Sequence, residues 1–179
     1  MDTSKTISIL GISGSLRSNS SNTNVLNAIA KMLPESVKFK LFDKLHEIPP
    51  FSPGDEENHA IQDFKALIKN ANAVIICTPE YAFGVPGVLK NALDWTVSTG
   101  EFNEKPVSAI SASPLNSGGD KALASLLLTL TALGTKRNDQ SSLAIPNIKL
   151  KMDVSGSMTD ELTVALLEDQ INNLLSIIE

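Results

Sequence analysis

A stretch rich in hydroxyl side chains carries the clearest chemical signal in this sequence. From Ser13 to Thr23 it reads SGSLRSNSSNT, with a single arginine, Arg17, among six serine and threonine residues. An apolar run at 6–12 precedes it, and a helical pattern at 23–33 follows. The amides at a helix N-terminus have no partner within the helix, and hydroxyl groups and a guanidinium add further donors for an anion. The stretch therefore predicts a monophosphate site, and the alternative is a solvated loop whose serines only cap backbone groups.

Better-known nucleotide loops do not match this stretch. Its glycines, Gly11 and Gly14, do not give the G-x-G-x-x-G pattern, and no Gly-Lys-Ser/Thr ending follows. The nucleophile elbow G-x-S-x-G fails because Ser15 occupies its last position, which leaves a hydrolase as a weak alternative. Asp43 could hold a ribose, although it lies further from the loop than the usual spacing of about 20 residues.

A second stretch suits a flat ring. The sequence TPEYAFGVPGVLKNALDW, from Thr78 to Trp95, places Tyr81 and Phe83 in a turn shaped by glycine and proline. Such a turn presents backbone amides and carbonyls at fixed positions beside an apolar surface, which a planar heteroaromatic ligand requires. The alternative is a turn whose aromatic residues pack on the sheet. Taken together, the two stretches favour a ligand with one phosphate and one large ring.

Alternating strand and helix patterns position these loops. Short apolar runs predict strands at 6–12, 37–41, 73–77, 107–112 and 142–147. Helical spacing of apolar residues predicts helices at 23–33, 61–71, 85–97, 119–134 and 157–178, the last opening on a capping box of Ser157 and Asp160. Five alternating pairs predict a doubly wound α/β fold, a five-stranded parallel sheet with helices on both faces, formed by residues 1–179 as one domain. In such a sheet ligands bind beyond the carboxyl ends of the strands.

Composition and net charge restrict the classes of partner that this protein is expected to bind. A formal net charge of −5 without a dense basic run disfavours binding to nucleic acid or to an anionic membrane, so the expected partner is a small molecule. No apolar stretch reaches the roughly 18–20 residues of a membrane span, and residues 1–5 do not open a secretory signal. Cys77, the only cysteine, is expected to be a small core residue in a cytoplasmic protein. His46 and His59 lack the spacing of a metal site.

Three motifs carry a family resemblance. They are GSLRSNSSNT (14–23), PEYAFGVPGVLKNALDW (79–95) and SPLNSGG (113–119). In this order they resemble the NADPH-dependent FMN reductases, a family with a flavodoxin-like fold that includes quinone, azo-dye and chromate reductases. The resemblance implies a flavodoxin-like sheet and bound FMN. It also implies an enzyme that passes hydride from NAD(P)H through FMN to a quinone, azo or flavin acceptor.

The resemblance also assigns residues. It implies that the FMN phosphate is surrounded by Ser15, Arg17, Ser20, Asn22 and Thr23. It implies that the isoalloxazine ring is lined, largely through backbone groups, by Pro79, Glu80, Tyr81 and Ala82, with Ser113 closing the other side. Ala82 departs from the asparagine that many members carry. No catalytic acid or base is nominated, and a homodimer or homotetramer is expected. The alternative is a flavodoxin-like electron carrier without nicotinamide oxidation, which the mild charge disfavours.

Overall fold

A five-stranded parallel sheet forms the centre of the protein. The computed structural model describes residues 6–54 and 57–178. Its strands are β1 (Ile7–Ser13), β2 (Val37–Phe42), β3 (Ala73–Thr78), β4 (Val107–Ala112) and β5 (Ser142–Ile145). They lie in the order β2-β1-β3-β4-β5, and every adjacent pair is parallel. The expected fold class is therefore confirmed. Residues 1–5, on which the expectation of no secretory signal rested, lie outside the described residues.

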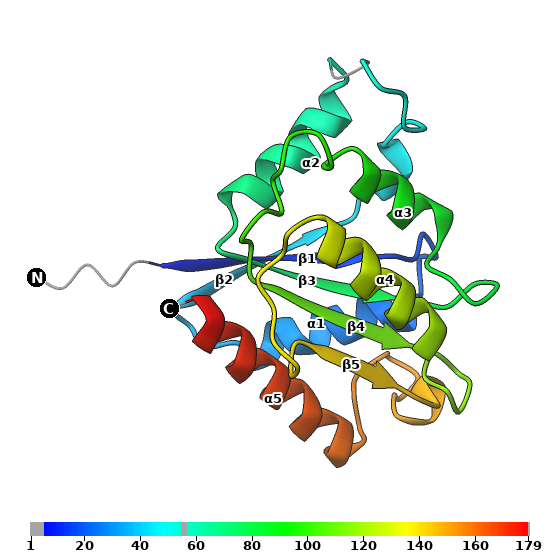
Figure 1. Cartoon of the computed structure of the whole chain (residues 1–179). Coiled ribbons are helices and arrows are strands. Elements are labelled where there is room, and N and C mark those ends of the chain that lie inside the picture. Colours follow the sequence, from blue (N-terminus) through cyan, green and yellow to red (C-terminus); the bar gives the residue numbers. More distant parts are fainter. Residues whose placement is uncertain (1–5, 55–56, 179) are drawn as a thin grey trace, which may run out of the picture.

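Helices cover both faces of the sheet, as Figure 1 shows. The helices are α1 (Ser21–Met32), α2 (His59–Asn70), α3 (Gly87–Asp94), α4 (Asp120–Ala132) and α5 (Glu161–Ile178), with short 3₁₀ turns η1 (Leu45–Glu47) and η2 (Ile148–Leu150). The helices α2, α3 and α4 pack on one face, and α1 and α5 pack on the other. Within the described ranges, no helix is long and apolar enough to cross a membrane.

The burial of each strand follows from its place in the sheet. Every residue of β3 and β4 is buried, because helices cover both faces of these inner strands. In β2, a strand at the sheet edge, buried or half-buried residues alternate with exposed lysines. Trp95 is 2% exposed, and its indole N–H donates to the carbonyl oxygen of Pro49 at 3.0 Å. This residue, whose packing the sequence left open, therefore lies in the core.

Every helix begins one to four residues from its predicted start, and in two of them the capping contacts explain the difference. The helix expected at 85–97 is shorter, because Pro86 is its N-cap and residues 95–97 form turns with i to i−3 hydrogen bonds. The capping box expected from Ser157 is wrong. Asp160 caps α5 instead, and its carboxylate accepts from the backbone N–H of Thr163 at 2.9 Å. A hydrogen bond from the Thr163 hydroxyl, together with that backbone bond, holds the pKa of Asp160 below its usual range.

Candidate functional site

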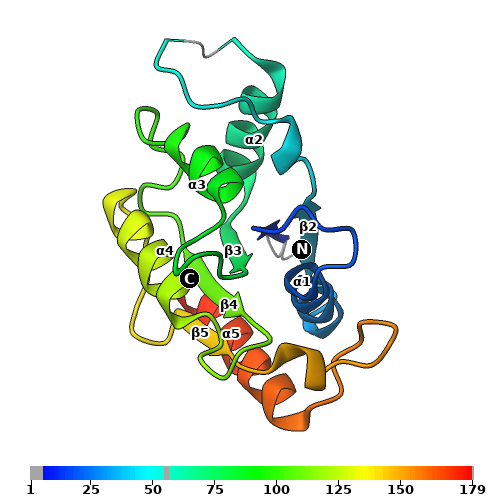
Figure 2. The same cartoon turned by 90° about the vertical axis from the view of Figure 1, so that its right-hand side faces the viewer.

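The predicted site residues meet at the carboxyl edge of the sheet. The loops after β1, β3 and β4 lie together there, and Figure 2 views the molecule from this edge. A cavity of about 370 Å³, here called the central pocket, opens among them. Eight of the ten predicted site residues line it: Ser15, Arg17, Ser20, Asn22, Pro79, Glu80, Tyr81 and Ser113. The other two, Thr23 and Ala82, are placed differently.

The loop after β1 builds the polar end of the central pocket. Ser20 is buried and is the N-cap of α1, and its hydroxyl accepts from the Asn22 N–H at 3.2 Å. Ser15 makes a similar turn, because its hydroxyl accepts from the Arg17 N–H at 3.3 Å. These contacts fix the loop in front of the helix N-terminus, where first-turn amides are available to an anion. Arg17 itself is exposed and free to reach a ligand.

Asn22 joins three elements beneath this loop. Its side-chain oxygen accepts from the Cys77 thiol at 3.2 Å, and its side-chain nitrogen donates to the carbonyl oxygen of Ala112 at 3.4 Å. The N-terminus of α1 is thereby tied to the ends of β3 and β4. Burial raises the pKa of the Cys77 thiol, so it stays protonated and donates this bond. Asn22 is therefore committed mainly to positioning the loop.

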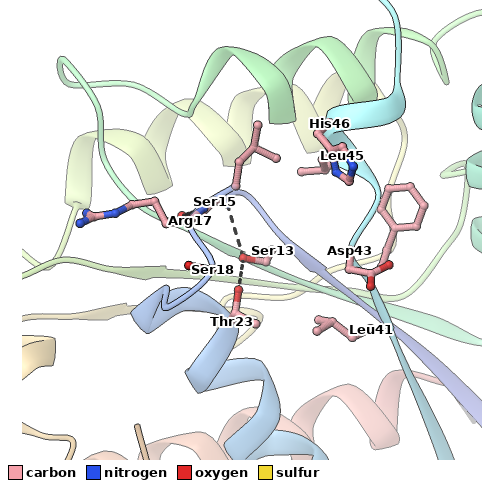
Figure 3. A pocket seen from close by; sticks show the side chains of 11 residues that line it. Ser13, Ser15, Arg17, Ser18, Thr23, Leu41, Asp43, Leu45 and His46 are labelled. Atoms are coloured by element: carbon pink, nitrogen blue, oxygen red, sulfur yellow. Dashed lines mark hydrogen bonds between the residues drawn. The ribbon is translucent and has the colours of Figure 1, made fainter. Parts of the chain in front are cut away.

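Thr23 faces a second cavity on the far side of the loop. Its hydroxyl donates to Ser13 Oγ at 2.9 Å (Figure 3), and both residues line a cavity of about 220 Å³, here called the side pocket. The remaining lining of the side pocket comes from the loop after β1 and from the end of β2 and η1. The structure therefore separates Thr23 from Ser20 and Asn22, whereas Ser15 and Arg17 line both cavities.

The loop after β3 forms a tight hairpin. Tyr81 and Gly84 exchange two backbone hydrogen bonds of 3.0 Å, and the residues between them, Ala82 and Phe83, have φ angles of 48° and 63°. Two left-handed residues at these positions are typical of a type I′ turn, which favours asparagine and glycine. Ala82 therefore lies at the exposed tip rather than on the pocket wall. Asparagine, the residue that the family resemblance leads us to expect at this position, tolerates this backbone region better than alanine does.

Glu80 anchors this hairpin to a distant helix. Its carboxylate accepts from the backbone N–H groups of Lys121 and Ala122, both at 3.0 Å. The N-cap of α4 is Gly119, which has no side chain to satisfy these amides, so Glu80 serves as the cap from another loop. The negative charge also lies at the favourable end of the helix dipole. Its carboxylate is therefore committed to joining the hairpin to α4.

The loop after β4 closes the opposite wall. The Ser113 hydroxyl accepts from the Leu115 N–H at 3.2 Å, and the Ser113 carbonyl accepts from the Ile148 N–H at 3.0 Å. Leu115, in the loop that the resemblance places at this wall, also lines the pocket, as do Ile148 and the exposed Lys149, which sequence analysis missed. Only the position of Ile148 and Lys149 just after the fifth strand could have indicated them. They bring the loop after β5 into the site.

The residues of the central pocket fit FMN. One end offers the hydroxyls of Ser15 and Ser20, the Arg17 guanidinium and the amides that begin α1, a donor set suited to a phosphate. The loops after β3 and β4 add the Pro79–Tyr81 backbone and the apolar side chain of Leu115, groups suited to a flat ring with polar edges. The cavity volume falls within the roughly 300–1,000 Å³ typical of small-molecule sites.

Comparisons with known proteins agree with this geometry. Residues 7–149 match the family model "NADPH-dependent FMN reductase". The chain is 31% identical over 176 residues to an NAD(P)H-dependent FMN reductase of Pseudomonas aeruginosa, covering 94% of this chain and 93% of that protein. It is 29% identical over 167 residues to a 2-hydroxy-1,4-benzoquinone reductase of a Burkholderia species, with 90% and 91% coverage.

A solved structure extends the likeness to three dimensions. The NAD(P)H:(acceptor) oxidoreductase FerB of Paracoccus denitrificans superposes with a TM-score of 0.87 at 26% identity, and the match covers 96% of this chain and 97% of that one. Fold, sequence and pocket therefore lead to one assignment, which confirms the expected relationship: the chain belongs to the NADPH-dependent FMN reductase family.

Proposed function

We propose that the protein is an FMN-dependent oxidoreductase that uses NAD(P)H to reduce a quinone. The observation that carries this proposal is the division of the pocket lining between anion-binding groups from the loop after β1 and backbone and apolar groups from the loops after β3 and β4, within a chain of this family. A ligand with one phosphate and one large ring matches that division. The relative named for benzoquinone reduction supports the acceptor class.

The protein's own residues bind the FMN phosphate and orient the ring. Arg17, Ser15 and Ser20 hold the phosphate, and the backbone of 79–81 supports one edge of the ring. When bound, FMN supplies the redox chemistry, taking a hydride from the nicotinamide and giving two electrons to the acceptor. The protein's contribution is to keep one face of the ring accessible, so that donor and acceptor stack there in turn. Tyr81 and Leu115, 49% and 60% exposed, flank this opening.

Two measurements test the proposal in order. Purified protein is first titrated with FMN, and we expect flavin absorbance to co-elute with the protein and the melting temperature to rise. The loaded protein is then mixed without oxygen with NADH or NADPH, and we expect prompt bleaching, followed by recovery on adding a benzoquinone. Azo dyes and free flavin complete the acceptor panel. Protein that gains no flavin contradicts the proposal. Protein that binds flavin but is not bleached is an electron carrier instead.

We also propose that the protein acts in the cytoplasm as one domain that assembles into a homodimer or homotetramer. The single, buried cysteine suits a reducing compartment. Leu128 on α4 is 74% exposed and Val97 after α3 is 65% exposed, which supports a subunit contact on this side of the sheet. Sedimentation velocity of the FMN-loaded protein measures the assembly, and a monomer at micromolar concentration would contradict it.

A further inference from the structure

The side pocket is a second cavity that the proposed FMN site does not use. Its lining residues are Ser13, Ser15, Leu16, Arg17, Ser18, Thr23, Leu41, Phe42, Asp43, Leu45 and His46. Only Ser15 and Arg17 are shared with the central pocket. The two cavities therefore lie on opposite sides of the segment 15–17, and a ligand that occupied both would cross it. At about 220 Å³, the side pocket is smaller than a typical whole-ligand site and suits one part of a larger molecule.

Asp43 gives the side pocket its chemistry. It directly follows β2, which pairs in parallel with β1 up to Ile12 and Phe42, so the loops after these two strands are neighbours. Figure 3 shows the carboxylate across the cavity from Ser13 and Thr23. Among residues 6–54 and 57–178, nothing forms a hydrogen bond or ion pair with this carboxylate, and the residue is exposed to the cavity. The Asp43 carboxylate is therefore an available hydrogen-bond acceptor that faces the hydroxyl groups of Ser13 and Thr23.

This arrangement is suited to a ribose. A carboxylate accepts hydrogen bonds from both hydroxyls of a vicinal diol, and serine and threonine hydroxyls add donors and acceptors. In dinucleotide-binding sheets, an acidic residue after the second strand holds the 2′-hydroxyl of the adenosine ribose beside the phosphate loop. Asp43 occupies the corresponding place here, at the end of the strand adjacent to β1.

The charges around the pocket disfavour a phosphate on that ribose. A 2′-phosphate beside the Asp43 carboxylate would be repelled. Arg17 extends away from Asp43 in Figure 3, toward the central pocket that it also lines. Lys44 lies 3.7 Å from Glu47, measured between Nζ and Oε2, and is already paired. His46, which also lines the pocket, has its Nε2 3.9 Å from the other carboxylate oxygen of Glu47, so none of these three basic groups is committed to the position of a 2′-phosphate.

We propose that the side pocket binds the adenosine ribose of the nicotinamide cosubstrate through Asp43, and that the enzyme consequently prefers NADH to NADPH. This inference rests on the proposed function, because it assigns a second site to the same reaction. Asp43 acts in binding and specificity and takes no part in hydride transfer.

The first test measures kcat/KM of FMN-loaded protein for NADH and for NADPH. Asp43→Asn keeps the size of the side chain but removes the charge, and we expect kcat/KM for NADH to fall roughly tenfold or more. We expect kcat/KM for NADPH to stay the same or to rise, because the repulsion is gone. The matched control is Asp63→Asn, which removes an exposed carboxylate from α2 nearby and should leave both values unchanged. Equal losses with both cosubstrates, or no loss, would overturn the inference.

The second test needs no activity. ADP-ribose is titrated calorimetrically into FMN-loaded wild type, and we expect binding that weakens at least tenfold in Asp43→Asn, while its 2′-phosphorylated form binds more weakly to wild type. FMN affinity should be the same in both proteins. Failure of wild type to bind ADP-ribose overturns the inference even where NADH is oxidised. If wild type oxidises neither cosubstrate, the proposed function fails, and Asp43-dependent ADP-ribose binding still identifies the nucleotide site.

Discussion

The two loops that meet in the central pocket are stabilised in different ways. The loop after β1 is held largely by its own residues, through the Ser20 cap and the short turn at Ser15. The loop after β3 contains two left-handed residues at its tip and is held by Glu80, whose carboxylate reaches α4. The first loop therefore takes its shape from local hydrogen bonds, with Asn22 beneath it as a long-range anchor. The second loop depends on a long-range contact, because Glu80 and Lys121 are 41 residues apart in the sequence.

Arg17→Ala separates binding from folding in the first loop. The side chain is exposed, so its removal should leave the melting temperature of the flavin-free protein unchanged. It should weaken FMN binding roughly ten- to hundredfold, because a charge-assisted hydrogen bond is worth about 1.5–3 kcal/mol. Fluorescence titration of FMN measures this, with Lys38→Ala on exposed β2 as the control. An unchanged FMN affinity would remove Arg17 from the phosphate site.

Asn22→Ala tests the two hydrogen bonds that the Asn22 side chain makes beneath the same loop. Removing its side chain leaves the Ala112 carbonyl and the Cys77 thiol without these partners. We expect the free energy of unfolding to fall by about 1–3 kcal/mol, because buried polar groups lose their hydrogen bonds. Urea unfolding measures the change, and Asn27→Ala at an exposed position of the same helix is the control. Equal free energies of unfolding for the two variants would show that the Asn22 hydrogen bonds contribute nothing to stability.

Glu80→Ala removes the external support of the second loop. Two first-turn amides of α4 lose their acceptor, and loss of such a cap costs about 0.5–2 kcal/mol. FMN affinity should fall as well, because the hairpin is no longer tied to α4. Glu80→Gln retains an acceptor oxygen and should recover part of both losses. If Gln and Ala behaved alike in urea unfolding and FMN titration, the capping role would be wrong.

Local sequence patterns predicted the helices and strands but not the contacts between distant segments. The strand at 107–112 was predicted with the bounds observed, because both of its faces are buried and all its residues are compatible with a buried strand. The shortened α3 was missed, because apolar residues at helical spacing continue to Val97 although the hydrogen bonding changes to turns after Asp94. Local composition cannot distinguish these turns from another turn of helix.

For the site as well, the sequence indicated local features and missed the long-range contacts. The capped, donor-rich character of the loop after β1 could be predicted because its capping contacts lie within a few residues. The commitment of Asn22 to Cys77, 55 residues away, and of Glu80 to α4 is visible only after folding. Thr23 has the right residue type for a phosphate ligand, but its first-turn position directs its hydroxyl to Ser13. Side-chain direction on a helix therefore separates residues that sequence spacing groups together.

Ala82→Gly should be the mildest change and the only one that stabilises. Ala82 has a φ of 48°, a conformation that costs a residue with a β-carbon roughly 1 kcal/mol and costs glycine almost nothing. Because glycine also makes the unfolded chain more flexible, the expected net gain is about 0.5 kcal/mol, measured by urea unfolding. The control is Ala66→Gly within α2, where the same substitution should destabilise by about 1 kcal/mol. Opposite signs at the two positions would locate strain in the second loop, whereas destabilisation at both would show that the hairpin tip is relaxed.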